Sequence, residues 1–284
     1  MSVVIEARGL SKKYRRHQAL DDASFTVQQG RIVGLIGRNG AGKTTALKAI
    51  LGLTPYQGSL TVLGRDPAHS RDELMREVSF IADTAVLPRW MRVRQALDYV
   101  QGVHPAFQRE RAEAFLKTTE IRPGSRVKEL SKGMVTQLHL ALILAIRARL
   151  LVLDEPTLGL DLLYRRRFYD TLLNDYMDEG RTILVTTHQV EEIENILTDV
   201  LFIEKGRIVL DTPLDSLGER YLQVLVSPDR LEAARAVGPF HERTVFGRTV
   251  MFFEGKGEAQ LAPLGEVGTP TVSDLFVATM QEAA

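Results

Sequence analysis

Residues 37–45, GRNGAGKTT, constrain the fold of this chain more than any other feature. They satisfy the pattern G-x-x-x-x-G-K-[ST] and lie between an apolar run, residues 31–36, and an amphipathic run, residues 46–51. This order of strand, glycine-rich loop and helix is typical of loops that bind phosphate groups. The glycines let backbone N–H groups turn toward the anion, and the positive end of the following helix faces it. The sequence therefore predicts an α/β domain that binds a nucleotide.

The residues of this loop have different predicted roles. Lys43 is expected to reach the β- and γ-phosphates, and the hydroxyl of Thr44 to ligate Mg²⁺. The alternative, an ordinary glycine turn before a helix, is disfavoured by the full motif and by its flanking elements. The predicted phosphate contacts are Gly37, Arg38, Asn39, Gly40, Ala41, Gly42, Lys43, Thr44 and Thr45.

Composition limits the classes of protein to consider. The 284 residues carry 36 Lys and Arg, 36 Asp and Glu, and no cysteine. This neutral balance lacks the basic excess of nucleic-acid binders, and the absence of cysteine fits a reducing compartment. The length predicts one large domain plus a smaller one, or two medium ones. We see no secretory signal and no uncharged apolar run long enough to span a bilayer, so work at a membrane would need a partner that holds the chain there.

Two early strands are predicted at residues 3–7 and 23–27 from their alternating pattern. Tyr14 lies between them, and its amphipathic ring could stack on a nucleotide base, although a lone tyrosine more often simply packs. The basic residues around it, in the segment 12–16, are interpreted as a solvated loop. Further strands are expected at residues 58–64 and 78–82, the second ending at Asp83.

From Asp83 to about residue 150 the strand signal disappears, and two helices are predicted at residues 92–100 and 105–119. We interpret this region as a helical insertion in the α/β domain. An apolar helix follows Ser131, which is placed as an N-cap. The basic run of residues 165–167 is interpreted as a solvated helix face.

Polar side chains follow two further apolar strands. Residues 150–153 end in Asp154 and Glu155, and residues 182–187 end in His188. Ligands of open α/β sheets gather at the carboxyl ends of strands, so these side chains are expected to face the phosphate loop. Asp154 is a predicted Mg²⁺ ligand, and Glu155 could orient or deprotonate a water. His188 could donate to the γ-phosphate or cap a helix predicted at residues 189–197.

The end of the chain differs in character. Residues 201–210 are predicted to form a hairpin that closes the sheet, and Pro213 then interrupts the chain. A strand at residues 221–226, a helix at 229–237 and a hairpin at 244–253 indicate a small α+β appendage.

Together these segments resemble the ATP-binding subunit of an ABC transporter, over residues 1–217. The phosphate loop matches, and residues 130–134, LSKGM, are similar to the signature sequence LSGGQ. Residues 150–161 resemble the Walker B strand, its glutamate and the D-loop, and His188 matches the switch histidine. Tyr14 lies where the family has its adenine-stacking aromatic residue. Residues 271–276, TVSDLF, resemble the closing segment of exporter-type subunits with a short C-terminal extension.

The resemblance implies a fold and a mechanism. It implies a RecA-like P-loop NTPase core with an antiparallel β subdomain, an inserted helical subdomain at about residues 84–150, and an accessory domain at residues 218–284. Two ATPase subunits, identical or different, would pack head to tail. Ser131 and Gly133 of one would contact the ATP bound by the other. Glu155 would polarise the attacking water, and His188 would hold the γ-phosphate. Closure on ATP and reopening would drive an integral membrane permease on a separate chain, at the cytoplasmic face of the membrane.

Two departures from the family pattern bear on this mechanism. Asp83 stands where the family has a glutamine that touches Mg²⁺, and a carboxylate is also a good ligand for that ion. Lys132 and Met134 replace Gly and Gln in the signature. A lysine in the first turn opposes the helix dipole by about 0.3–1 kcal/mol, and we hypothesise that the γ-phosphate offsets this in the closed dimer.

Residues 87–91 lie where the family forms the groove for the permease, with internal packing as the equal alternative. Two other functions are alternatives to transport. A soluble ABC ATPase acting on ribosomes or DNA is disfavoured by the single phosphate loop, the single signature and the neutral charge. An ATP-dependent regulator with little turnover is disfavoured by Glu155 and His188, while Asp83 leaves it open.

Overall fold

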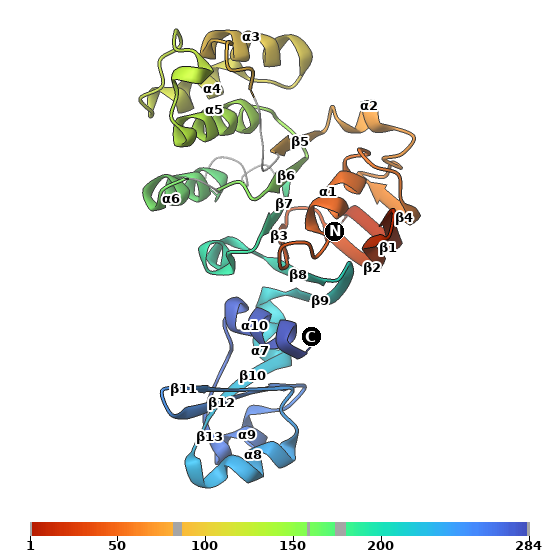
Figure 1. The fold of residues 1–284 in the computed structure, drawn as a ribbon, viewed down its shortest axis with the longest axis vertical. Helices are drawn as coiled ribbons and strands as arrows, with labels where there is room; N and C mark the ends of the chain where they lie inside the picture. The colour runs from red at the N-terminus through yellow and green to blue at the C-terminus, as the bar shows by residue number, and fades with distance from the viewer. Residues whose placement is uncertain (1, 82–86, 158–159, 174–179, 283–284) are drawn as a thin grey trace.

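The computed structural model describes residues 2–81, 87–157, 160–173 and 180–282, and their strands form three sheets (Figure 1). The central sheet has six strands in the order β5-β6-β7-β3-β8-β9. Neighbouring strands are parallel except β8 and β9. The bounds are β3 Ile32–Ile36, β5 Val78–Ile81, β6 Leu150–Asp154, β7 Thr182–Thr187, β8 Asp199–Glu204 and β9 Arg207–Pro213.

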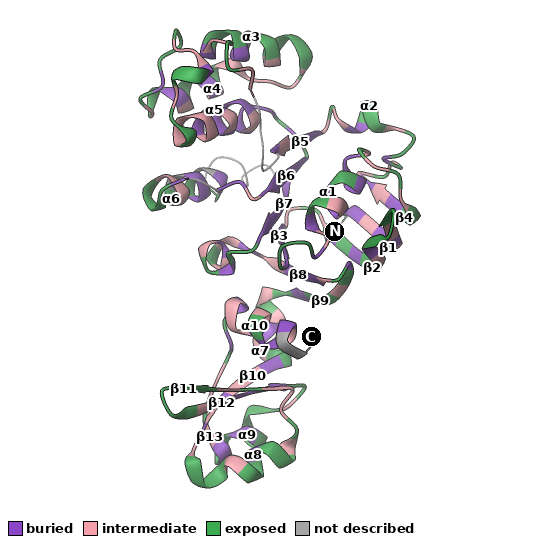
Figure 2. Ribbon diagram, in the orientation of Figure 1, coloured by how far each residue is buried: buried purple, intermediate pink, exposed green. Residues whose placement is uncertain are grey.

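The strand order determines which loops meet. β7 lies between β3, which leads into the phosphate loop, and β6, which ends in Asp154. Every residue of β3, β6 and β7 is buried, as Figure 2 shows for the middle of the molecule. Such continuous apolar runs are typical of parallel strands that are covered on both faces. The carboxyl ends of β3, β6 and β7 therefore lie at one edge of the sheet.

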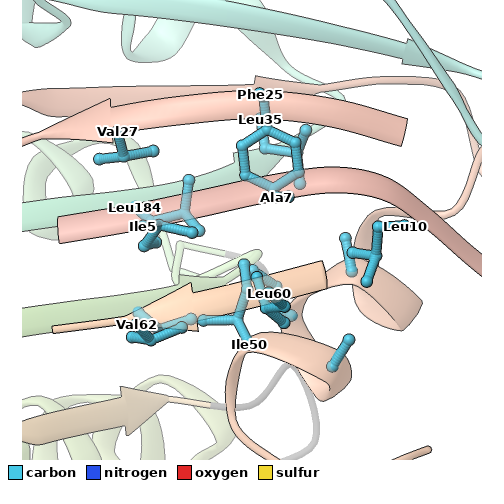
Figure 3. Packing of buried hydrophobic residues seen from close by; sticks show 14 of the residues in the cluster. Ile5, Ala7, Leu10, Phe25, Val27, Leu35, Ile50, Leu60, Val62 and Leu184 are labelled. Atoms are coloured by element: carbon cyan, nitrogen blue, oxygen red, sulfur yellow. The ribbon is translucent and has the colours of Figure 1, made fainter. Parts of the chain in front are cut away.

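A three-stranded antiparallel sheet, ordered β2-β1-β4, packs beside this core. Its strands are β1 Val3–Tyr14, β2 His17–Gln28 and β4 Gln57–Val62. Figure 3 shows its inward side chains, among them Ile5, Leu60 and Val62, close to Ile50 of helix α1 (Lys43–Ile50). This apolar cluster fixes the helix that begins at the phosphate loop.

β1 and β2 are longer than predicted, and the segment interpreted as a loop is mostly paired. The two strands stay paired up to Tyr14 opposite His17, although their register shifts at several bulges. Arg15 then turns the chain with φ of 51°. Each bulge adds an unpaired residue and shifts the alternation of side chains between the two faces. The alternating pattern in the sequence is therefore interrupted before the strands end, and it predicts strands that are too short.

The helical subdomain lies between β5 and β6 and forms one end of the molecule (Figure 1). Its elements are α3 Val93–Val103, α4 Arg109–Lys117, the short 3₁₀ helix η1 Val127–Glu129 and α5 Lys132–Leu144. A separate apolar cluster that includes Leu97, Leu116 and Leu138 holds them together. Leu87 and Met91 pack against this cluster, whereas Trp90 is 67% exposed.

The helix predicted at residues 189–197 is wrong. The chain forms two short 3₁₀ helices, η4 Val190–Glu192 and η5 Glu194–Ile196. Val190, Ile193 and Ile196 recur every third residue, and side chains three apart lie on one side of a 3₁₀ helix. Val190 and Ile193 are buried in the central core, and Ile196 packs against it.

The last part of the chain forms a four-stranded sheet, ordered β11-β12-β10-β13, at the other end of the molecule (Figure 1). A further apolar cluster, including Val224, Met251 and Phe253, joins it to two short helices. The elements are α7 Leu217–Arg220, β10 Tyr221–Val226, α8 Leu231–Val237, β11 His241–Val245, β12 Arg248–Glu254, α9 Glu258–Leu261 and β13 Gly265–Gly268.

Helix α10 (Val272–Glu282) returns from this appendage to the central core. Its Phe276 ring meets that of Phe202 edge to face, with centroids 5.3 Å apart, and Leu275 is buried in the same cluster as β8. The predicted fold class is confirmed. The boundary predicted at residue 217 stays a prediction, since the final helix packs on the earlier part. Among the described residues, no helix combines the length and apolar character that a bilayer crossing requires.

Candidate active site

The phosphate loop follows β3 and presses closely on two neighbouring segments. A Cβ at Gly42 would lie 2.5 Å from the carbonyl oxygen of Ala19, and one at Gly37 would lie 2.5 Å from that of Ile203. Gly42 has φ of 116° and Gly40 has φ of 84°, which side chains with a Cβ rarely adopt. The glycines of the motif are thus required by the close approach of the backbone at positions 37 and 42, and by the turn at 40 and 42.

Lys43 is the first residue of α1 and is only 6% exposed. Its Nζ donates to the carbonyl oxygen of Gly37 at 2.7 Å and lies 3.5 Å from Oε1 of Glu155. A lysine held inside its own loop in this way presents a point charge to whatever anion the loop surrounds. The predicted phosphate ligand is therefore already oriented by the fold.

Thr44 and Asp154 bring two hard oxygen ligands together. The Thr44 hydroxyl donates to Oδ2 of Asp154 at 3.1 Å, and the Thr186 hydroxyl donates to Oδ1 at 2.6 Å. Asp154 is 3% exposed and Thr186 is fully buried, so the orientation of the carboxylate is fixed from both sides. The register of β6 and β7, with Asp154 opposite Thr186, produces this arrangement.

Glu155 and His188 form a contact at the same edge of the sheet. Oε2 of Glu155 lies 2.8 Å from Nδ1 of His188, and the glutamate side chain is 14% exposed. The backbone N–H of Glu155 donates to the carbonyl oxygen of Thr186. Glu155 has φ of 48°, a left-handed conformation that costs an ordinary residue about 1–3 kcal/mol. Strain of this kind in a polar residue is characteristic of functional sites.

A cavity of about 260 Å³ unites most of the predicted nucleotide contacts. Gly37 and Ala41 belong to the loop but do not line this cavity, and His188 adjoins it through Glu155. Asp83, the third predicted metal ligand, lies outside the described residues. The lining residues are Tyr14, His17, Ala19, Arg38, Asn39, Gly40, Gly42, Lys43, Thr44, Thr45, Asp154 and Glu155.

Tyr14 lies at the end of β1 and reaches the cavity from the antiparallel sheet. It is 42% exposed, its hydroxyl lies 3.3 Å from that of Thr54, and Nζ of Lys12 lies 5.0 Å from its ring centroid. His17 and Ala19 of β2 also line the cavity. Sequence reasoning missed both, since only the pairing of β1 with β2 brings them there.

Ser131 and Gly133 lie at the start of α5 and do not line this cavity. Ser131 is exposed, and its hydroxyl accepts a hydrogen bond from the backbone N–H of Met134 at 3.2 Å. This is the N-cap predicted from local sequence. The amides of the first turn remain directed outward, as at any helix N-terminus.

The residues present fit a nucleoside triphosphate with Mg²⁺. The described residues hold no cluster of three or more His, Cys, Asp or Glu side chains suited to a metal. Mg²⁺ typically binds one or two carboxylates together with substrate phosphates and waters, and Asp154 beside Thr44 supplies such a partial set. The loop, its lysine and this oxygen pair define the site of a P-loop nucleotide-binding protein of the RecA-like type.

Comparison with known proteins narrows this class. The ABC transporter family model matches residues 20–158. The Nod factor export ATP-binding protein I of Sinorhizobium fredii is 31% identical over 294 residues, covering 97% of this chain and 85% of the relative. That of Burkholderia lata is 37% identical over 215 residues, covering 73% and 70%.

Similar proteins without that name give the same family. The ABC transporter ATP-binding protein YtrB of Bacillus subtilis is 29% identical over 226 residues, covering 80% of this chain and 77% of the relative. A solved ATP-binding subunit of an ABC transporter superposes with a TM-score of 0.69 at 28% identity, covering 76% of this chain and 92% of that one. The chain belongs to the ATP-binding subunits of ABC transporters, and it is accordingly an ATPase.

Proposed function

We propose that this chain binds and hydrolyses ATP as one of a pair of ATPase subunits that power a separate membrane permease for export. The observation that carries the proposal is the group at the sheet edge. Glu155 contacts His188 at 2.8 Å and Lys43 at 3.5 Å, beside the Thr44–Asp154 pair. These are the base, the phosphate ligands and the metal ligands that ATP hydrolysis needs.

Each residue then has a defined task. The loop amides and Lys43 bind the phosphates, while Tyr14 stacks on the adenine ring. Thr44 and Asp154, with Asp83, hold Mg²⁺, which when bound neutralises charge on the β- and γ-phosphates. Glu155 accepts a proton from the attacking water or orients it, and His188 donates to the γ-phosphate.

The dimer is supported by what one chain lacks. Its cavity of about 260 Å³ lies below the usual range of roughly 300–1,000 Å³ for ligand pockets. Ser131 and Gly133, with the outward amides of α5, lie outside it. A head-to-tail pair with twofold symmetry would bring this helix end to the other copy's phosphates, producing two equivalent composite sites.

Several observations support a membrane partner and a direction of transport. Relatives with up to 37% identity are named for the export of Nod factor, and a bacterial exporter with ATP bound shares the fold. Trp90 is 67% exposed on the helical subdomain, which suits contact with a permease at the cytoplasmic face of the membrane. We further propose residues 1–217 as the ATPase domain, with residues 84–150 inserted, and residues 218–284 as an accessory domain.

Glu155→Gln tests the proposal. The amide preserves the shape of the side chain but cannot accept the proton, so we expect single-turnover hydrolysis to fall by about 10²–10⁴-fold. ATP binding should persist, and the ATP-loaded variant should accumulate as a dimer in size-exclusion chromatography with light scattering. Hydrolysis at the wild-type rate, or an ATP-loaded variant that stays monomeric even with its membrane partner, would contradict the proposal.

A further inference from the structure

Arg165, on the first turn of α6 (Leu162–Thr171), is not part of a solvated helix face as predicted from its basic run. Its side chain is only 22% exposed, whereas the neighbouring Arg166 is exposed. The helix begins at Asp161, whose carboxylate accepts a hydrogen bond from the backbone N–H of Tyr164 at 3.1 Å. The guanidinium of Arg165 faces other residues of the protein rather than solvent.

The guanidinium joins two segments that are distant in sequence. Its Nε donates to the carbonyl oxygen of Leu160 at 2.8 Å, and its Nη1 donates to Oε1 of Gln189 at 3.2 Å. The same Nη1 forms an ion pair with Oε1 of Glu192 in η4. A planar fork of donors can hold several acceptors in a fixed geometry, which a lysine ammonium on its flexible stem cannot.

Glu192 extends the connection to the loop after β6. Its other oxygen, Oε2, accepts a hydrogen bond from the hydroxyl of Thr157 at 3.4 Å, and that hydroxyl lies 3.3 Å from the hydroxyl of Tyr169. Thr157 and Tyr169 are both buried. The Arg165–Glu192 pair thus bonds the segment that follows β6 to the segment that follows β7, beneath the sheet edge.

The bonded residues lie next in sequence to the proposed catalytic pair. Thr157 is two residues after Glu155, and Gln189 directly follows His188. Arg165 itself does not line the nucleotide cavity of its own chain. Its contacts instead limit how far the backbone beside Glu155 can move relative to the backbone beside His188.

We propose that Arg165 is a positioning residue that keeps Glu155 and His188 at the separation of 2.8 Å seen here. The inference rests on the proposed function, because it assumes that these two side chains act together on ATP. Without the guanidinium, Gln189 and Glu192 lose their shared donor, and the loop that carries His188 gains freedom. ATP is still bound, since the phosphate loop and Lys43 are untouched, but fewer bound molecules meet the correct catalytic geometry.

Arg165→Ala and Arg165→Lys, with Arg166→Ala as the matched control, test the inference. We expect Arg165→Ala to lower kcat about 10–100-fold, the order that small misplacements of reacting groups cause. Its Kd for a fluorescent ATP analogue should stay within about twofold of wild type, since Lys43 is unaffected. Arg165→Lys should recover only part of the loss, and Arg166→Ala should behave as wild type.

A spectroscopic measurement separates positioning from general stability. With ¹³C-labelled histidine, the ring signal of His188, assigned by its loss in His188→Ala, should move or broaden in Arg165→Ala. The signals of the other five of the six histidines should stay in place. If Arg165→Ala fails to fold, Gln189→Leu supplies the same test, because it removes one acceptor and leaves the Arg165–Glu192 pair intact.

Two outcomes would overturn the inference. One is wild-type kcat in Arg165→Ala. The other is a loss of kcat that is matched by loss of ATP affinity, with the His188 signal unchanged, which would show a structural role alone. If Glu155→Gln is inactive while Arg165→Ala is fully active, only this inference fails. If Glu155→Gln itself hydrolyses ATP normally, the proposed function fails.

Discussion

The carboxyl edge of the central sheet and the N-terminus of α5 carry the two halves of the proposed ATP site, and they differ in how their polar groups are held. At the sheet edge, Lys43 is 6% exposed and Asp154 is 3% exposed, and each has partners within the chain. At the start of α5, Ser131 is exposed, and its hydroxyl accepts a hydrogen bond from the backbone of its own helix.

In the proposed dimer, this difference would correspond to a division of tasks between the two chains. Polar groups that are fixed by partners before the ligand arrives lose little freedom when they bind it. The sheet edge is such a site, since Lys43 and Asp154 are already oriented by partners within the chain. The start of α5 presents its N-terminal end and the exposed Ser131 to solvent, and in the proposed dimer it would receive its ligand from the other chain. A substitution at each half should therefore affect different measurements.

Ser131→Asp gives the largest expected effect on this comparison. Aspartate is as good an N-cap as serine, so the free energy of unfolding should change by less than about 0.5 kcal/mol. A carboxylate that faces the γ-phosphate of the ATP bound by the other chain would repel it. Like charges in contact cost several kcal/mol. We expect ATP turnover to fall about a hundredfold or more, measured by phosphate release.

The control for this experiment is Ser131→Ala, which should lose about 1 kcal/mol of stability with the cap. Equal turnover in Ser131→Asp and wild type would mean that α5 meets no phosphate. The two halves would then differ in how their polar groups are held, but α5 would have no part in binding ATP.

The sheet edge was predictable from sequence because its determinants are local. The glycines, Lys43 and Thr44 form one continuous motif, and Asp154 and His188 each follow an apolar strand directly. The rule that strand ends gather at one sheet edge then brings them together. The family resemblance added the pairing of Ser131 with a second chain, which no local pattern indicates.

The parts that sequence did not predict depend on contacts between distant residues. Arg165 resembles a surface residue in its basic run, and its contacts with Gln189 and Glu192, more than twenty residues away, cannot be read from that run. His17 reaches the cavity through the pairing of β1 with β2. Because of the bulges between β1 and β2, the alternating pattern in the sequence predicted strands shorter than those in the structure.

His139 lies on α5, the helix whose N-terminus forms the second half of the proposed ATP site, and it tests how firmly this helix is packed. Burial lowers the pKa of this histidine from 6.5 to about 4. Because its folded-state pKa lies below its unfolded value, the stability that depends on its neutral form is fully present above pH 6.5 and is lost as the pH falls toward 4. At pH 5 the loss should be about 2 kcal/mol relative to pH 7.5.

The measurement is urea unfolding at both pH values for wild type and His139→Gln. The difference in unfolding free energy between the two proteins should change by about 2 kcal/mol, since glutamine does not titrate. His17→Gln, a change at an exposed histidine, should keep the wild-type pH dependence. If His139→Gln and wild type lose stability in parallel, the histidine is hydrated and this part of α5 is less firmly packed than the structure indicates.

Lys132→Ala gives the smallest expected effect and tests whether the N-terminus of α5 binds an anion. Lys132 is the first residue of α5 and is exposed. Its charge opposes the helix dipole by about 0.3–1 kcal/mol, so alanine should raise the unfolding free energy by up to that amount at low salt. Lys128→Ala, at an exposed lysine of η1 outside the helix, is the control.

The same substitution should lower activity while it raises stability, if the γ-phosphate of the ATP bound by a second chain lies opposite this lysine. In that case Lys132→Ala should weaken ATP-dependent dimerisation and lower turnover about two- to fivefold at low salt, as loss of a partly exposed charge pair of up to about 1 kcal/mol predicts. The effect should shrink as salt screens the pair. A gain in stability with unchanged ATP affinity and turnover at both salt concentrations would leave Lys132 as a helix-destabilising residue without a ligand. The exposed end of α5 would then owe any phosphate binding to Ser131 and the backbone amides alone.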